Sequence, residues 1–275
     1  MTSKTVNINT VGDLQYITFP RLCAAPGVRH IFSTRKGGVS EGCFGEMNLS
    51  LRNGDSRENV IENYRRICGA AGIDTSHLVL SRQTHTKNVK IVNSSYCGTG
   101  ITKPEFSDVD GLVTNEPLVA LVTQFADCVP LLFYDPVARV CANSHSGWRG
   151  TAQKIGAETV RIMKEDFGCD PGNIIAAIGP CICKECYEID RPVYDAFVAA
   201  GFAADTLEKI FTKTRSAHFL LDLPLANKLI LLEAGIKEDN LDVADLCTYE
   251  NCDVLHSHRA TAGKRGNLAA IIEMY

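Results

Sequence analysis

Apolar residues along the chain alternate with polar ones, or form short continuous runs, in many segments separated by turn-forming residues. Alternation with a period of two is typical of half-buried strands, and short β-branched or aromatic runs are typical of buried strands. We therefore predict strands at Leu14–Phe19, His30–Thr34, Leu78–Ser81, Val89–Val92, Asp108–Thr114, Leu118–Gln124, Val129–Tyr134, Arg139–Ser144, Asn173–Ile178 and Leu268–Met274. Residues 1–13 are polar and are expected to be loosely ordered.

Other segments carry apolar residues at helical spacing. The clearest of them begins at Ser56, a residue type favoured at helix N-caps, and has Val60, Tyr64 and Ile67 on one face. The predicted helices are Ser56–Gly72, Gly147–Phe167, Arg191–Ala200 and Leu223–Glu233. Because no internal repeat or linker interrupts this succession, we expect a single domain over residues 1–275 with mixed sheets.

One stretch combines a strand pattern with reactive side chains. Two runs, Val129–Tyr134 and Arg139–Ser144, flank the turn signal Asp135-Pro136, which predicts a β-hairpin. If Pro136 and Val137 form the tip of the turn, Cys128 pairs directly with His145 across the open end. A thiol facing an imidazole is typical either of nucleophilic catalysis or of a metal site.

Two other segments have features of anion-binding sites. The loop 35–45 has four glycines and begins with Arg35 and Lys36. The residues Gly147–Gly150 follow a strand and open a helix, whose free N–H groups and dipole attract anions, and Arg149 adds a planar cation. The alternatives are a solvated loop in the first case and a surface salt bridge in the second.

The chain has 12 cysteines but no signal-peptide pattern, so we expect a reducing compartment and mostly buried, inert thiols. Three cysteines lie close together, at Cys181, Cys183 and Cys186, and the last two have the C-x-x-C spacing of a redox pair or half a zinc site. The only distant pair is Cys247 and Cys252, which is no second C-x-x-C. The sequence therefore gives little support to a structural zinc.

Near the end of the chain, His256 and His258 alternate and would share one face of a strand. That spacing can chelate a metal, but Arg259 beside them fits an anion-lined pocket as well.

Composition and charge narrow the possible partners. Apolar residues make up 45% and charged residues 22% of the chain, as in ordinary globular proteins. A net charge of −4 gives no electrostatic reason to expect nucleic acid or an anionic membrane. No run approaches the roughly 18–20 apolar residues of a membrane helix. We expect a cytoplasmic protein, a monomer or small homo-oligomer, without nucleic-acid or membrane partners.

Eight motifs in order resemble those of the laccase-domain family, once named multicopper polyphenol oxidoreductases and now described as purine nucleoside phosphorylases. They are Phe32-Ser-Thr-Arg-Lys-Gly-Gly-Val-Ser40, Gln83-Thr-His85, Asp108-Val-Asp-Gly-Leu-Val-Thr114, Asp127-Cys-Val-Pro130, His145-Ser-Gly-Trp-Arg-Gly150, Ile178-Gly-Pro180, Cys186-Tyr-Glu188 and Cys247-Thr-Tyr249. The chain departs from the family at Cys181 and Cys183, and at His256, where phenylalanine is usual.

The resemblance implies an α+β fold with two mixed β-sheets in a four-layer α/β/β/α arrangement, similar to the catalytic domain of cytotoxic necrotizing factor toxins. It also implies that His85, Cys128 and His145 bind a metal. Two imidazoles and a thiolate suit tetrahedral zinc, and three protein ligands leave a fourth position open.

The implied function is that of a zinc-dependent purine nucleoside phosphorylase acting on adenosine, inosine and methylthioadenosine, with adenosine deaminase side activity. An open zinc position suits hydrolytic deamination, and cationic side chains suit phosphate. The candidate catalytic residues are Cys128, Asp127 and Arg149, and the candidate substrate or phosphate ligands are Arg35, Asn48, Gln83, Arg149 and Arg259.

Two other chemistries are to be weighed against this one. The first is a cysteine hydrolase or amidase with Cys128 as nucleophile and His145 as base, as in family members thought to edit cell-wall precursors. The second is multicopper oxidation, for which seven histidines and a single His-x-His are too few. Copper can still occupy such a site in vitro, because Cu²⁺ outcompetes Zn²⁺ at most nitrogen and sulfur sites.

Overall fold

The predicted hairpin lies at the centre of a six-stranded sheet. In the computed structural model, which describes residues 1–275, this sheet has the order β15 (Leu241–Val243), β11 (Ile175–Ile178), β9 (Val129–Asp135), β10 (Val140–Ser146), β7 (Gly111–Thr114) and β5 (Val89–Ile91). Every residue of β9 and β10 is buried, as expected for central strands that are covered on both faces.

A second, seven-stranded sheet packs against the first. Its order is β1 (Asn7–Val11), β2 (Leu14–Thr18), β3 (Val28–Ser33), β16 (Leu268–Met274), β8 (Ala120–Phe125), β4 (Leu78–Arg82) and β6 (Phe106–Ser107). Both sheets contain parallel and antiparallel pairs, for example β4 parallel to β8 and β16 antiparallel to β3. The predicted single α+β domain with mixed sheets is therefore confirmed.

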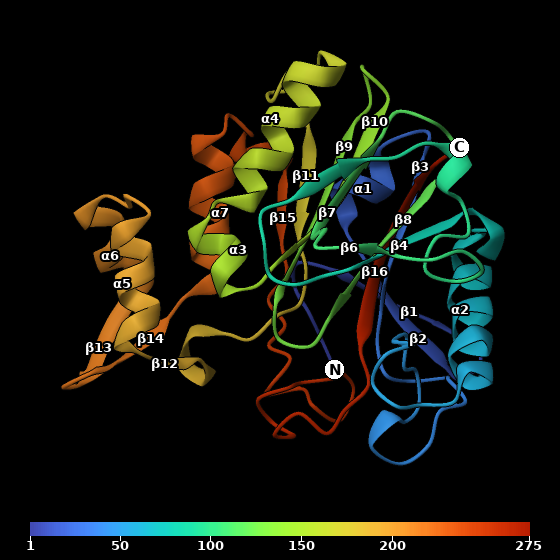
Figure 1. Ribbon diagram of the computed structural model, residues 1–275, viewed down its shortest axis with the longest axis horizontal. Coiled ribbons are helices and arrows are strands. Elements are labelled where there is room, and N and C mark those ends of the chain that lie inside the picture. Colours follow the sequence, from blue (N-terminus) through green and yellow to red (C-terminus); the bar gives the residue numbers. More distant parts are fainter.

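Helices cover the outer face of each sheet (Figure 1). The helices α3 (Trp148–Ala152), α4 (Ile155–Phe167) and α7 (Leu223–Glu233) lie on the six-stranded sheet, and α2 (Arg57–Ala71) lies on the seven-stranded sheet. The apolar core between the sheets includes Phe32 and Ile272 from one side and Leu132 and Tyr134 from the other. The short helix α1 (Pro20–Ala24) contributes Leu22 to this core.

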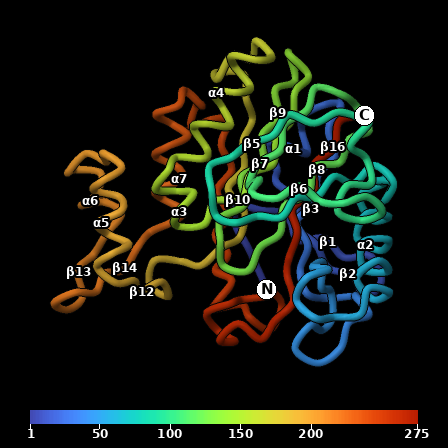
Figure 2. Tube along the Cα trace, in the orientation of Figure 1, coloured from blue at the N-terminus to red at the C-terminus, as the bar shows by residue number.

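A small lobe projects beside α3 and α7, at the left of Figures 1 and 2. It consists of α5 (Arg191–Ala199), α6 (Ala204–Ile210) and a three-stranded sheet of β12 (Glu188–Asp190), β14 (His218–Leu221) and β13 (Phe211–Arg215). This lobe lies outside the two large sheets. The four-layer arrangement and the similarity to toxin domains stay predictions. Single 3-10 turns lie at Gly42–Phe44 (η1), Thr75–His77 (η2), Ser94–Tyr96 (η3), Lys184–Cys186 (η4) and Glu238–Asn240 (η5).

Several predicted elements match the structure closely. Ser56 caps α2 by accepting a hydrogen bond from the N–H of Asn59, and Gly72 ends the helix in the left-handed conformation. The strand β16 and the helix α7 have the predicted bounds.

Three local predictions are wrong. The hairpin loop is longer than a two-residue turn, because the carboxylate of Asp135 accepts hydrogen bonds from Val137 and Ala138, and β10 starts at Val140. The helix expected from Gly147 to Phe167 is broken into α3 and α4 at Lys154, which has a φ of 57°. Residues 7–11, expected to be loose, form β1, because they pair with β2.

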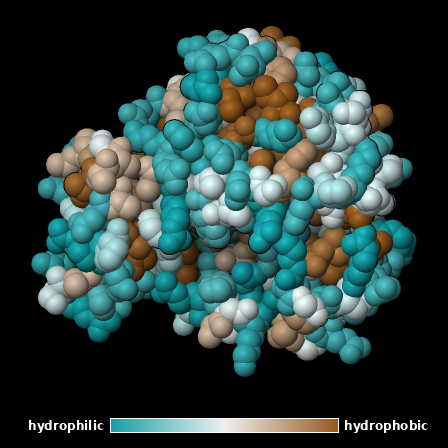
Figure 3. Space-filling view, in the orientation of Figure 1, coloured by the Kyte–Doolittle hydropathy of each residue, from teal (hydrophilic) through white to brown (hydrophobic).

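Polar side chains cover most of the face seen in Figure 3, and apolar side chains gather there in small patches. None of the helices is both long enough and apolar enough to cross a membrane.

Candidate metal centre and active site

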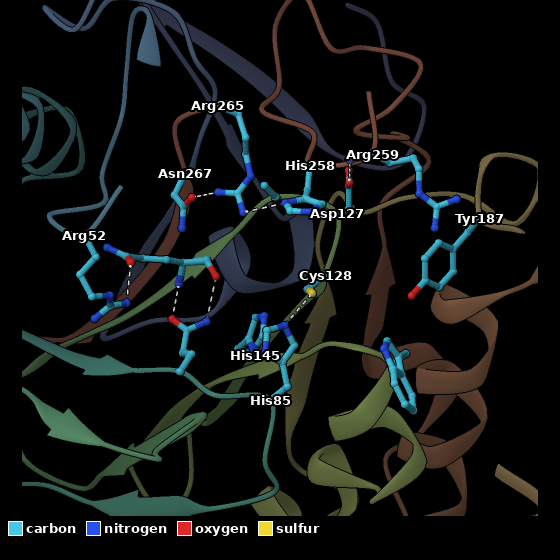
Figure 4. A pocket seen from close by; sticks show the side chains of 14 residues that line it. Arg52, His85, Asp127, Cys128, His145, Tyr187, His258, Arg259, Arg265 and Asn267 are labelled. Carbon is cyan, nitrogen blue, oxygen red and sulfur yellow. Dashed lines mark hydrogen bonds between the residues drawn. The ribbon is translucent and has the colours of Figure 1, made fainter. Parts of the chain in front are cut away.

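Three side chains from separate parts of the chain meet at the open end of the β9–β10 hairpin (Figure 4). His85 comes from the loop between β4 and β5, Cys128 directly precedes β9, and His145 is part of β10. The Nε2 of His85 lies 3.8 Å from the Sγ of Cys128, and the possible ligand atoms of all three residues lie within 4.8 Å of one another. The structure thus brings together the three predicted metal ligands.

The hairpin register differs from the prediction, but the prediction that Cys128 and His145 are close survives. His145 pairs with Pro130 instead of Cys128. This difference of two residues keeps the two side chains on the same face, because side chains alternate along a strand with a period of two.

The backbone around the cluster is held in unusual conformations. His85 and Asp127 have φ values of 66° and 86°, in the left-handed region that non-glycine residues seldom adopt. Gly147 must be a glycine, since a Cβ at this position would lie 2.6 Å from the ring of His85 and 3.0 Å from the sulfur of Cys128. Such constraints are common at functional sites.

Asp110 orients both histidines from beneath the site, where it is fully buried. Its carboxylate accepts a hydrogen bond from Nδ1 of His145 at 2.8 Å and from the backbone N–H groups of Thr84, His85 and Thr86. Burial raises the pKa of Asp110, but the hydrogen bonds that it accepts from His145 and from backbone N–H groups outweigh burial and lower the pKa to about 2. With Nδ1 held in this way, Nε2 of His145 is the nitrogen left to bind a metal.

The thiol of Cys128 is poised to ionise. Burial raises its pKa, but His145 and His85 outweigh this effect and lower the pKa to about 6. Conversely, burial lowers the pKa of His145, while Cys128 and Asp110 raise it to about 9. The thiolate, which is the form that binds metals and acts as a nucleophile, is therefore favoured at neutral pH.

The donor set fits a zinc ion. Tetrahedral zinc with ordinary Zn–N and Zn–S bonds places its donors about 3.3–3.6 Å apart, close to the 3.8 Å between His85 and Cys128. Two imidazoles and one thiolate are borderline-soft ligands that zinc accepts, and Asp110 supplies the carboxylate partner typical of metal-bound histidine.

The cluster opens into a cavity of about 420 Å³, which is large enough for a small-molecule ligand. The side chains that line it are those of Arg52, Gln83, His85, Gln124, Ala126, Asp127, Cys128, His145, Trp148, Tyr187, His258, Arg259, Arg265 and Asn267.

Cationic side chains outnumber acidic ones in this cavity. Arg52 is paired with Glu105, but Arg259 and Arg265 form no ion pair. Arg259 lies over the ring of Tyr187, with its guanidinium 5.2 Å from the ring centroid, and Nη2 of Arg265 lies 3.4 Å from Nδ1 of His258. Burial lowers the pKa of Arg265, a sign that its charge is poorly solvated.

Of the other predicted site residues, Gln83, Asp127 and Arg259 line the cavity. Gln83 is engaged with the backbone of Gln124 in both directions. Asp127 accepts hydrogen bonds from the hydroxyl of Thr248 at 2.6 Å and from the backbone N–H of Arg259 at 2.7 Å. It therefore fixes the loop that carries Arg259.

Arg35, Asn48 and Arg149 are not brought to the cavity. Arg35 donates to the carbonyls of Gly45 and Cys252, so it ties two loops together. Asn48 is fully buried, and its side-chain oxygen accepts from the N–H of Asn267. Arg149 is exposed and stacks on Trp148, with its guanidinium 4.2 Å from the ring centroid.

The tail histidines separate rather than share a strand face, because no strand forms there. His258 lines the cavity, whereas His256 is buried and neither of its ring nitrogens has a hydrogen-bond partner. Burial lowers the pKa of His256 to about 3, so it is neutral.

Sequence reasoning gave no role to several residues of the site: Arg52, Asp110, Gln124, Trp148, Tyr187, Arg265 and Asn267. Asp110, Trp148 and Tyr187 stood inside quoted motifs, and the two acidic residues of Asp108-Val-Asp110 were a usable signal for a histidine partner. Arg52 and Arg265 come from loops without any motif, so only the fold reveals them.

A partly buried His-Cys-His cluster with a carboxylate behind it and a cationic cavity in front defines a candidate metal-dependent active site. A family model described as multi-copper polyphenol oxidoreductase laccase matches residues 29–275. The chain belongs to this family.

Proteins from several organisms are similar to this chain. The chain is 37% identical over 245 residues, 88% of its length and 87% of the relative's, to a Bacillus subtilis (strain 168) protein named purine nucleoside phosphorylase YlmD. It is 32% identical over 220 residues, 79% of its length and 83% of the relative's, to a protein of an unknown prokaryotic organism named adenosine deaminase RL5. The crystal structure of Bacillus licheniformis hypothetical protein YfiH superposes with a TM-score of 0.91 at 30% identity, covering 98% of this chain and 99% of that one.

Proposed function

We propose that this protein is a zinc-dependent purine nucleoside phosphorylase of the cytoplasm. It would convert adenosine or inosine and phosphate into the free base and ribose 1-phosphate, and methylthioadenosine and phosphate into adenine and 5-methylthioribose 1-phosphate, with adenosine deamination as a side activity. The observation that carries the proposal is the cavity itself, which places unpaired arginines opposite a His-Cys-His cluster. The names of two relatives support the two activities.

Phosphate is assigned to Arg259, Arg265 and His258. Neither arginine has an acidic partner, and guanidinium groups bind phosphate oxygens in pairs of parallel hydrogen bonds. Asp127 holds this region in place through the N–H of Arg259 at 2.7 Å, so we assign it a positioning role rather than proton transfer.

The purine is assigned to the aromatic side of the cavity. Tyr187 and Trp148 line it, and flat aromatic side chains stack on purine bases. A bound zinc ion would supply Lewis acidity next to the base, and the residues that would hold it are His85, Cys128 and His145. Asp110 would keep His145 in the required tautomer.

The test is phosphate-dependent release of hypoxanthine from inosine by the zinc-loaded protein. Cys128→Ala is expected to abolish it, because the metal loses its only sulfur ligand. Arg265→Ala is expected to raise the KM for phosphate at least about tenfold, as for loss of a charge-assisted hydrogen bond. The matched control is Arg149→Ala, which removes an exposed arginine outside the cavity and is expected to leave that KM unchanged. Absence of base release with zinc and phosphate present would refute the proposal.

A second candidate function has its own structural support. Cys128, His145 and Asp110 form the order of contacts seen in cysteine hydrolases, with a thiolate next to an imidazole that a buried carboxylate orients. A protein that is purified without metal, is inactivated by alkylation of Cys128 and hydrolyses amide substrates would favour this function. A tightly bound zinc that protects Cys128 from alkylation would exclude it.

A further inference from the structure

Three further cysteines converge outside the cavity. The sulfurs of Cys183, Cys186 and Cys247 all lie within 4.8 Å of one another. In the segment after β11, Cys183 directly precedes the turn η4 and Cys186 is its last residue, and Cys247 follows β15. The two segments are joined side by side, since Cys181 and Cys247 form a parallel bridge.

Two contacts surround this cluster with groups that are common at metal sites. The backbone N–H of Cys183 lies 3.3 Å from the sulfur of Cys247 and donates to it, a hydrogen bond of the kind that stabilises thiolate ligands. The sulfur of Cys186 lies 3.9 Å from Oε1 of Glu250, so a carboxylate lies beside one of the three sulfurs.

The same residues have a regular spacing in the sequence. Cys183-x-x-Cys186 has no second C-x-x-C as partner, but Cys247-Thr-Tyr-Glu250 is a C-x-x-E segment with equal spacing. Paired ligands with two residues between them, on two segments, are the usual pattern of structural zinc sites.

We propose that Cys183, Cys186, Cys247 and Glu250 bind a second, structural zinc ion. Tetrahedral zinc places sulfur and oxygen donors about 3.6–3.8 Å apart, close to the 3.9 Å between Cys186 and Glu250. Binding displaces the three thiol protons to solvent. With four protein donors the site has no open position, so it takes no part in the reaction and does not depend on the proposed function.

This zinc would fasten two segments that form part of the cavity. Tyr187, a cavity-lining residue, directly follows Cys186. Thr248, which donates its hydroxyl hydrogen bond to Asp127, directly follows Cys247. The metal would therefore stabilise the wall of the active site without touching a substrate.

The test is a count of zinc per full-length chain by inductively coupled plasma mass spectrometry after gel filtration. Wild-type protein is expected to hold two ions, His85→Ala one and Cys183→Ser one. The matched control is Cys252→Ser, which changes a half-buried cysteine of the same loop outside the cluster and is expected to keep both.

Cobalt substitution gives a readout that does not require the variants to fold. Bound cobalt with three thiolates has a more intense sulfur-to-metal charge-transfer band than cobalt at the His85–Cys128–His145 site, which has one. The proposal is overturned if wild-type protein holds a single ion that Cys183→Ser retains, or if only the band of the single-thiolate site appears. A Cys183–Cys186 disulfide in the freshly purified protein, found by peptide mass analysis, would also overturn it. If wild-type protein holds a single ion and Cys183→Ser loses it, the proposed function is refuted and the structural zinc site is supported.

Discussion

The two cysteine clusters place the same functional group in opposite surroundings. Cys128 has two imidazoles as neighbours, with a cavity in front, whereas Cys183, Cys186 and Cys247 have no histidine among them and do not line the cavity. Three donors leave a metal one position for chemistry, while four donors close the coordination shell. If both proposals hold, one chain would give zinc a reactive role in one place and a structural role in another.

Without metal, the thiols of the two clusters also differ in pKa. Burial raises the pKa of Cys183 and of Cys186, and no cation compensates for it. Burial raises the pKa of Cys128 as well, but His145 and His85 outweigh it and lower the pKa to about 6. Neighbouring charge, rather than burial, decides which cysteine is reactive.

The strongest separation of the two roles comes from removing one sulfur at each site. Cys128→Ala is expected to bring phosphorolysis below detection. Cys183→Ser is expected instead to lower the Tm by about 5 °C or more, because a few kcal/mol of lost stability has this effect in a chain of this size. Activity assays and calorimetry on both proteins measure the difference. An equal loss of activity in both variants, at a temperature where both are folded, would contradict the division of roles.

Alkylation of the metal-free protein should resolve the two kinds of thiol. The alkylation rate at Cys128 should rise with pH, with a midpoint near pH 6. An ordinary thiol has a pKa of 9.0, so the acidity constant of Cys128 is about a thousandfold higher. Cys183 should remain unreactive below pH 9, since its pKa is raised. Mass spectrometry of iodoacetamide-treated peptides gives both profiles. A midpoint of about 9 at Cys128 would show that His145 does not stabilise its thiolate.

Removal of the carboxylate behind His145 should have a smaller effect. Asp110→Asn is expected to lower zinc affinity or activity about 10–100-fold, the usual result of losing the partner of a metal-bound histidine. Competition with a zinc chelator measures the affinity at the reactive site. The structural site has no histidine, so its zinc should be unaffected, and weakening of both ions would point to general loss of folding.

The smallest expected effect is at the exposed fourth donor. Glu250→Gln should weaken the structural zinc by less than about tenfold, because an exposed carboxylate contributes little beyond the three thiolates. Chelator titration followed by cobalt absorption measures this change. An unchanged affinity would reduce the site to three protein ligands, with water as the fourth.

Much of the fold could be predicted because strand and helix periods are local properties. The bounds of β16 and α7 follow from short apolar runs and capping residues. The hairpin register could not be predicted, since it depends on how Asp135 folds the loop back on itself. The error of two residues did not move any side chain to the other face, which is why Cys128 and His145 still meet.

The reactive cluster was accessible from sequence because its ligands lie in motifs, whereas its surroundings were not. Arg35 and Asn48 have suitable side chains, but both are used to hold loops together. Arg52 and Arg265 reach the cavity only through the path of the chain in three dimensions. Similarly, the spacing of cysteines alone does not point to Glu250, whose carboxylate lies 3.9 Å from the sulfur of Cys186.

The position of β16 has a consequence for how the protein is made. This last strand lies in the middle of the seven-stranded sheet, between β3 and β8. During synthesis, β3 and β8 therefore emerge from the ribosome long before the strand that joins them. Until residues 268–274 arrive, both strands present unpaired edges, which are sites of aggregation in nascent chains. The sheet cannot close before residues 268–274 are available, and a chaperone that shields β3 and β8 would act in that interval.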